Sequence, residues 1–185
     1  MKRISLFLVL VMLLAGCAGE NDQINRALAL RARVQQMKVS FDVDMTADYG
    51  DKTYDFSMNC KGDMEGNLSF TVTEPESIAG ITGTISKGSG KLTFDDQMLV
   101  FEMLSDGLLS PVCGPWTMLK ALQGGYLTSC GTEGDALRVT IDDSYKDKAL
   151  HLDIWLGEGD IPKRCEIYWE GRRLLTMNVK NFAFL

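Results

Sequence analysis

The sequence predicts an α+β fold, a strongly curved antiparallel sheet that forms a half-open β-barrel. An N-terminal helix precedes the sheet, and a short central helix plugs its concave face. Three observations lead to this prediction. Apolar and polar residues alternate with a period of two over most of the chain. Turn residues separate the alternating runs at roughly ten-residue intervals. One segment in the middle, Ser110–Tyr126, instead has apolar residues at helical spacing.

The first residues have the features of an export signal. Lys2 and Arg3 precede an apolar run, Ile4–Leu14, in which Ser5 is the one polar residue and which is too short to span a membrane. The run ends in Leu-Ala-Gly-Cys, which is typical of a bacterial lipobox. We therefore predict that residues 1–16 are a lipoprotein signal peptide. Lipidation of Cys17 would then anchor the protein to a membrane, on the extracytoplasmic side of the cell envelope. The alternative is an ordinary signal peptide followed by an unmodified cysteine.

The rest of the chain is expected to form one domain. Residues 17–23 are polar and predict a short tether, and residues 24–185 are long enough to bury a hydrophobic core. Ile24–Met37 predicts the first helix. Its apolar face is expected to include Leu28 and Val34, with arginines on the opposite face.

Period-two alternation predicts nine or ten strands, each with one buried and one wet face, and the pattern is weaker over residues 80–86. Glycine-rich or acidic turns separate most of them. The segment Leu127–Asp135 is rich in Gly and Thr, and is expected to be irregular. The expected strands lie within residues 39–46, 54–60, 68–72, 80–86, 92–94, 98–104, 137–141, 150–156, 165–169 and 175–179.

The central helix has clear end signals. Pro115 suits a first helical position, and Gly124 with Gly125 suits a stop. Little of this helix can face water, so it is expected to lie inside the curved sheet. The apolar residues that recur along it are Val112, Trp116, Leu119 and Leu122.

Four cysteines follow Cys17. An exported chain can form disulfides, and four cysteines allow three connectivities. Cys113 and Cys130 flank the central helix and could staple it, whereas Cys60 and Cys165 fall on apolar strand faces. From the sequence, these four cysteines can equally well form disulfides or lie buried as small hydrophobic side chains with free thiols.

Most catalytic and cofactor chemistry lacks support in the sequence. The chain has 19 basic and 25 acidic residues and no basic cluster, which argues against nucleic acid as a partner. The single histidine, His151, lies on a polar strand face, and no nucleophile motif accompanies it. Asp42 and Asp44 share one strand face, where solvated side chains are expected rather than a glycosidase pair. We expect no enzymatic activity, no cofactor and no metal.

The order of elements resembles the LolA/LolB-like family of lipoprotein carriers and sorting factors. The segments that carry the resemblance are Pro75–Leu104, Ser110–Tyr126 and Ile161–Phe182. The resemblance implies a curved sheet wrapped around helices, with an apolar cavity in which carriers hold acyl chains. It also implies that lipid-anchored relatives can act by binding a cell-wall amidase, as a germination lipoprotein of spore-forming bacteria does. The chain departs from the soluble carriers in having its own lipobox and five cysteines.

Two functions are therefore compared. The first is a membrane-anchored, non-enzymatic lipoprotein that binds a lipid or acyl chain in the concavity. The second is an anchored scaffold for another envelope protein, such as a cell-wall hydrolase, with the outward Trp155 as the candidate contact. The outcome depends on whether the central helix fills the concavity, because a packed core is the alternative for the same side chains. The candidate cavity residues are Phe41, Phe56, Phe70, Trp116, Leu119, Leu122, Ile154, Ile167 and Trp169.

Overall fold

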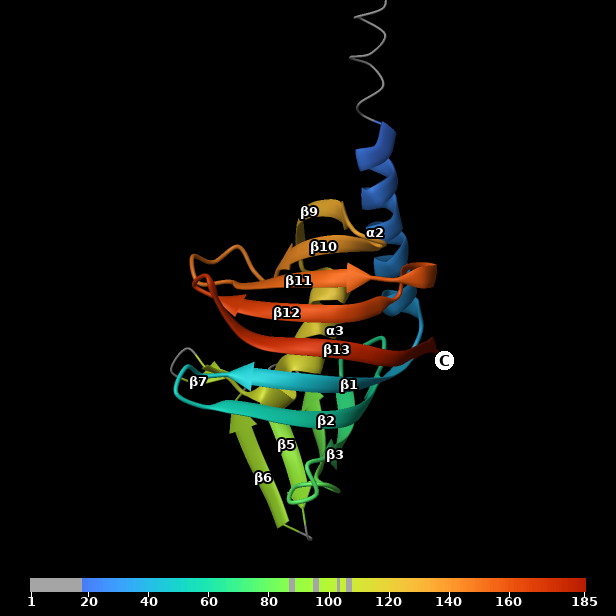
Figure 1. The fold of residues 1–185 in the computed structure, drawn as a ribbon. Coiled ribbons are helices and arrows are strands. Elements are labelled where there is room, and N and C mark those ends of the chain that lie inside the picture. Colours follow the sequence, from blue (N-terminus) through green and yellow to red (C-terminus); the bar gives the residue numbers. More distant parts are fainter. Residues whose placement is uncertain (1–17, 87–88, 95–96, 103, 106–107) are drawn as a thin grey trace, which may run out of the picture.

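A computed structural model describes residues 18–86, 89–94, 97–102, 104–105 and 108–185 (Figure 1). The predicted signal peptide and Cys17 lie outside these residues. The helices and strands are α2 (Ala18–Gln36), β1 (Val39–Asp48), β2 (Thr53–Gly62), β3 (Leu68–Glu74), β4 (Thr82–Ser86), β5 (Ser89–Phe94), β6 (Gln97–Glu102), β7 (Leu104–Ser105), β8 (Leu108–Leu109), a 3-10 helix η2 (Pro111–Cys113), α3 (Gly114–Gly124), β9 (Tyr126–Glu133), β10 (Ala136–Asp142), β11 (Leu150–Leu156), a 3-10 helix η3 (Glu158–Asp160), β12 (Pro162–Trp169) and β13 (Arg172–Phe184).

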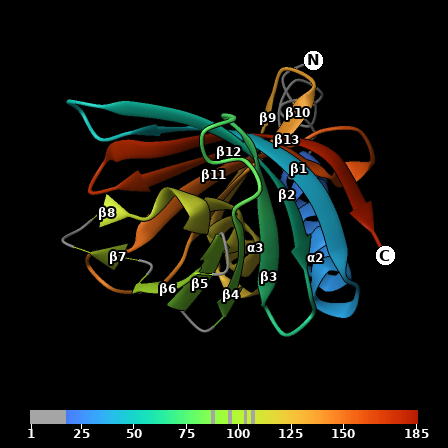
Figure 2. The same cartoon turned by 90° about the horizontal axis from the view of Figure 1, so that it is seen from below.

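Eleven strands form one antiparallel sheet in the order β6-β5-β4-β3-β2-β1-β13-β12-β11-β10-β9. Two meanders, β1–β6 and β9–β13, meet where the first strand pairs with the last, from Val39 opposite Phe184 to Ala47 opposite Leu175. The sheet is open, with β6 and β9 at its edges. Figure 2 shows it curving around α3. The predicted antiparallel sheet with an N-terminal and a short central helix is confirmed.

One more strand forms than the sequence predicts in the second half of the chain. β9 occupies the segment that was expected to be irregular, and it pairs with β10 from Tyr126 opposite Asp142 to Glu133 opposite Ala136. Its outer edge lies near α2, where Gln23 Nε2 donates a hydrogen bond to Thr132 Oγ1 at 2.9 Å. The expectation is wrong because tertiary pairing outweighs the local Gly content.

Helix α2 begins at Ala18, so the residues expected to form a polar tether, 18–23, are helical. The buried face consists of Ala27, Leu30 and Val34. The expectation for Leu28 is wrong, since its side chain is 45% exposed. One residue corresponds to a rotation of about 100° around the helix, which separates Leu28 from the face of Ala27.

Helix α3 lies in close contact with the concave face of the sheet. Gly62 of β2 makes this approach possible, because a Cβ built there would lie 2.3 Å from Leu119 Cδ2. Gly114 plays the same part at the start of the helix, where a Cβ would lie 2.9 Å from Leu175 Cδ1. Both glycines therefore serve close packing between helix and sheet.

This contact gives a testable prediction. We expect Gly62→Ala to lower the free energy of unfolding by about 1–3 kcal/mol, because the added methyl group overpacks the core. Urea denaturation measures the change. Gly131→Ala in β9 is the matched control, since a Cβ there meets nothing within 4 Å. Combining Gly62→Ala with Leu119→Ala should cost less than the sum of the two single changes, and strict additivity would contradict the proposed contact.

Pairing and burial as free thiols were both open from the sequence; all four described cysteines are free, and Cys60, Cys113 and Cys165 are buried. Cys60 and Cys165 lie on β2 and β12, which β1 and β13 separate. Three strand spacings amount to about 14 Å, beyond the reach of a disulfide. Cys113 lies directly before the start of α3. Cys130 lies on a strand that pairs with β10, and β10 is next to the other end of α3, so the helix separates the two thiols. Burial raises the pKa of the Cys113 thiol to about 12, so this thiol is a hydrophobic part of the core.

Candidate functional site

The predicted cavity residues come together in one core beneath α3. Trp116 and Trp169 are half-buried at the margin of this core, and the remaining seven residues are fully buried. The seven are Phe41, Phe56, Phe70, Leu119, Leu122, Ile154 and Ile167. They come from β1, β2, β3, α3, β11 and β12, so the convergence expected from strand parity is present.

The space left beside α3 is very small. A cavity of about 10 Å³ lies between α2, α3 and β10, lined by aliphatic side chains that include Leu30, Leu122 and Ile141. Such a volume is near the minimum for a single water molecule and far too small for an alkyl chain. Leu122 therefore fills this part of the concavity, and Leu119 packs against Gly62 of β2. The predicted residues beneath α3 thus form a packed core, which was the alternative to an acyl-chain cavity.

Polar bonds from α2 hold the C-terminal end of α3 in place. Arg31 Nε donates to the carbonyl oxygen of Leu122 at 3.0 Å, and Arg31 Nη2 to that of Gly125 at 2.7 Å. Gln35 Nε2 donates to the carbonyl oxygen of Gln123 at 2.6 Å. The last carbonyls of a helix have no partner within it, so these bonds satisfy groups that would otherwise be unpaired. Toward the other end, Trp116 Nε1 donates to the carbonyl oxygen of Gly66 at 2.8 Å.

The apolar inner face of the sheet continues beyond this filled region. Ile85 of β4 is fully buried, Leu92 of β5 is half-buried, and Leu99 of β6 is 61% exposed. These side chains share one face, because Gly83 lies opposite Leu92, and Leu92 lies opposite Leu99. The concave apolar surface thus emerges into solvent at the rim formed by β5 and β6.

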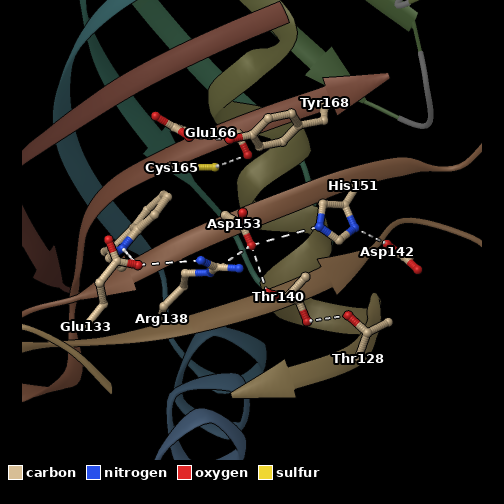
Figure 3. A network of polar contacts seen from close by, with 11 residues as sticks. Thr128, Glu133, Arg138, Thr140, Asp142, His151, Asp153, Cys165, Glu166 and Tyr168 are labelled. Carbon is tan, nitrogen blue, oxygen red and sulfur yellow. Dashed lines mark hydrogen bonds and ion pairs between the residues drawn. The ribbon is translucent and has the colours of Figure 1, made fainter. Parts of the chain in front are cut away.

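A polar network on the outer face of β9–β12 contains two buried carboxylates (Figure 3). Asp153 is 7% exposed and Glu166 is 4% exposed, and the two residues lie opposite each other in the β11–β12 pair. Asp153 Oδ1 accepts a hydrogen bond from Thr140 Oγ1 at 2.8 Å and lies 3.3 Å from Arg138 Nε. The sequence analysis did not identify this pair, because strand parity predicts only that both residues face outward.

Glu166 has three partners. Tyr168 Oη and Arg164 donate hydrogen bonds to its carboxylate, and Arg173 Nη1 donates at 3.1 Å. Burial favours the neutral acid, but the hydrogen bonds from Tyr168 and Arg164 and the guanidinium charges outweigh burial and lower the pKa of Glu166. Burial, together with the bond to Glu166, raises the pKa of Tyr168 to about 12. Neither group is suited to exchange protons near neutral pH.

The other polar residues considered from the sequence lie on solvated surfaces. His151 is half-exposed, with Nδ1 2.8 Å from Asp142 Oδ1, as expected for a surface histidine. Asp42 accepts a hydrogen bond from Asn59 Nδ2 at 2.6 Å, and Asp44 forms an ion pair with Lys180. Both aspartates are thus engaged by neighbours on the wet face of the sheet.

Trp155 points outward, as its strand parity predicts, and is partly covered by polar neighbours. Its Nε1 donates a hydrogen bond to Glu133 Oε2 at 3.1 Å. The guanidinium carbons of Arg164 and Arg138 lie 5.2 and 6.0 Å from the centre of the indole ring. The ring is therefore held in one orientation on the outer face.

No protein-family model and no curated protein matches the chain. Several solved structures are similar to it. An uncharacterised conserved protein from Thermus thermophilus has a TM-score of 0.50 and 10% identity, over 88% of this chain and 87% of that chain. A putative outer membrane lipoprotein-sorting protein domain from Vibrio parahaemolyticus has a TM-score of 0.48 and 12% identity, over 86% of this chain and 91% of that chain. A LolA superfamily protein from Nitrosomonas europaea has a TM-score of 0.45 and 10% identity, over 86% of this chain and 93% of that chain.

At these identities the likeness concerns the fold alone, and the Thermus protein shares that fold. The chain has an open, curved antiparallel sheet around a short helix. This is the fold that it shares with the Thermus protein, and it is also the architecture that the resemblance to the LolA/LolB-like family implies.

Proposed function

We propose that this protein is a lipid-anchored, non-enzymatic component of the cell envelope that binds an apolar ligand, such as an acyl chain, on the concave side of its sheet. The observation that carries the proposal is the apolar inner face that continues from buried Ile85 to exposed Leu99. An apolar surface left open at the rim of a concave sheet favours a ligand-binding role. The packed core beneath α3 counts against a ligand at the predicted cavity, so the proposal places the ligand at the rim formed by β5 and β6 instead.

The proposed anchor and the proposed site lie at opposite ends of the molecule. The lipobox in the sequence supports lipidation at Cys17, directly before α2 begins at Ala18. In Figure 1, the start of α2 and strand β6 are at opposite ends. A protein held by Cys17 would present β6 away from its own membrane. Within the described residues, no helix has the length and hydropathy of a membrane span.

Lipid analysis and fatty-acid titration test the proposal. Protein with Cys17→Ser, purified without detergent, should carry extractable lipid in native mass spectrometry and bind a fluorescent fatty acid. Leu99→Asp should weaken fatty-acid binding about ten- to hundredfold, because burial of one leucine contributes about 1.5–3 kcal/mol.

Met98→Asp is the matched control. Met98 is also 61% exposed on β6, but it lies opposite Thr93 on the outer face of the strand. Equal losses in the two variants would point to non-specific apolar contact and contradict a concave site. Absence of both lipid and fatty-acid binding, with a protein copurifying in their place, would favour the scaffold alternative.

A further inference from the structure

A groove around Trp155 on the outer face has the composition of a saccharide site, and we propose that it binds a neutral glycan. Its volume is about 340 Å³, at the lower end of the range for small-ligand pockets. This groove is on the opposite face of the sheet from the proposed apolar site, so the two proposals stand independently. The side chains that line it include Glu133, Asp135, Trp155, Lys163, Arg164 and Glu166.

Trp155 supplies a fixed aromatic surface in this groove. The hydrogen bond to Glu133 and the two flanking guanidinium groups set the orientation of the ring, which remains partly exposed. The face of an indole ring carries partial negative charge, and the C–H groups on one face of a sugar ring carry partial positive charge. A ring that is already immobilised loses little conformational entropy when a sugar stacks on it.

The charges in the groove are balanced in pairs. Lys163 Nζ lies 3.1 Å from Asp135 Oδ1, and Arg164 pairs with the buried Glu166. Glu133 is paired with Arg138, at 3.5 Å between Oε2 and Nη1. A charged ligand would have to compete with one of these pairs. A neutral polyhydroxylated ligand can donate to the carboxylates and accept from the cations while every pair stays intact. This balance favours a saccharide over a phosphate or a basic peptide.

The buried Glu166 gives one side of the groove a preset geometry. Its carboxylate accepts hydrogen bonds from Tyr168 and Arg173, and it orients the guanidinium group of Arg164. Prepositioned donors lower the cost of ordering side chains on binding. The groove thus combines a fixed aromatic ring, fixed donors and balanced charge.

Titration of the Cys17→Ser protein with the trimer of N-acetylglucosamine, followed by calorimetry and tryptophan fluorescence, tests the proposal. We expect saturable binding, with maltotriose as a second neutral probe. Trp155→Ala should weaken binding at least tenfold, and Trp155→Phe should weaken it less, because a smaller aromatic face remains. Lys163→Ala removes a side chain at the surface of the groove, and should weaken binding severalfold without affecting the fold.

Tyr145→Ala is the control, because Tyr145 is an exposed aromatic residue outside the groove. Its binding should equal that of the parent protein. Absence of saturable binding to both trimers would overturn the proposal, as would equal affinity in the parent, Trp155→Phe and Lys163→Ala proteins. Fatty-acid binding should be the same in all these variants, so failure of the glycan site is distinguishable from failure of the apolar site.

Discussion

Replacing Leu119 by alanine should lower the free energy of unfolding by about 3 kcal/mol. Leu119 is 1% exposed, and its side chain packs from α3 against Gly62 of β2. Truncation of a buried leucine removes apolar contacts and leaves a cavity, which together cost about 2–5 kcal/mol. Gly62 has no side chain with which to fill the space, so the cost should not fall at the lower end of this range.

Urea denaturation at pH 7 measures the loss, and Lys120→Ala is the matched control. Lys120 is the next residue of the same helix and is exposed, so its truncation should change stability by less than about 0.5 kcal/mol. The cavity in Leu119→Ala should also bind benzene, which would raise the stability of that variant alone. Equal stability of the two variants would show that α3 does not fill the concavity as described.

Replacing Glu166 by glutamine should lower the free energy of unfolding by about 2 kcal/mol at pH 7. Glu166 is almost completely buried and accepts hydrogen bonds from Tyr168, Arg164 and Arg173. Hydrogen bonds to a charged group contribute about 1.5–3 kcal/mol. The arginines are about half exposed and can turn to water, so the loss should not exceed this range.

The effect should depend on pH in a defined direction. The folded pKa of Glu166 is lowered from its ordinary value of 4.5, so its ionised form contributes stability above that value. The contribution is lost as the pH falls through the folded pKa, where the parent carboxyl is protonated and resembles glutamine. Parent and variant should therefore converge in acid when denaturation is followed from pH 7 downward.

Glu133→Gln serves as the comparison for Glu166→Gln. Glu133 is more than half exposed. It forms a surface ion pair with Arg138 and accepts a hydrogen bond from Trp155 Nε1, which a glutamine oxygen can also accept, so its replacement should cost less than about 1 kcal/mol. A constant difference between parent and Glu166→Gln at all pH values would contradict the role given to the carboxylate charge.

Much of the fold could be predicted because its local signals agree with its tertiary structure. Strands β1 and β2 alternate buried and wet residues as their sequences do. Pro115 and Gly124 mark the observed ends of α3, which spans Gly114–Gly124. The residues predicted to converge beneath the helix do so, because strand parity and helical spacing fix which side chains face the core.

The parts that could not be predicted depend on partners distant in sequence. β9 exists because β10 and α2 lie beside it, and its own composition favours no strand. Asp153 and Glu166 become a buried pair only once the register of β11 and β12 is known. The rejected disulfides also depend on strand order, because β1 and β13 separate Cys60 from Cys165. Sequence periodicity contains no information about strand order.

The pairing of β1 with β13 has a consequence for when the protein can fold. The middle strand of the sheet, β1, pairs with β13, and this pairing joins residues as far apart in the sequence as Val39 and Phe184. Contacts of such sequence separation slow folding, because a long loop must close before they form. The sheet cannot be completed until its C-terminal residues have been synthesised. A nascent chain therefore lacks its central strand pair until β13 has been synthesised, which suits a protein with a predicted export signal.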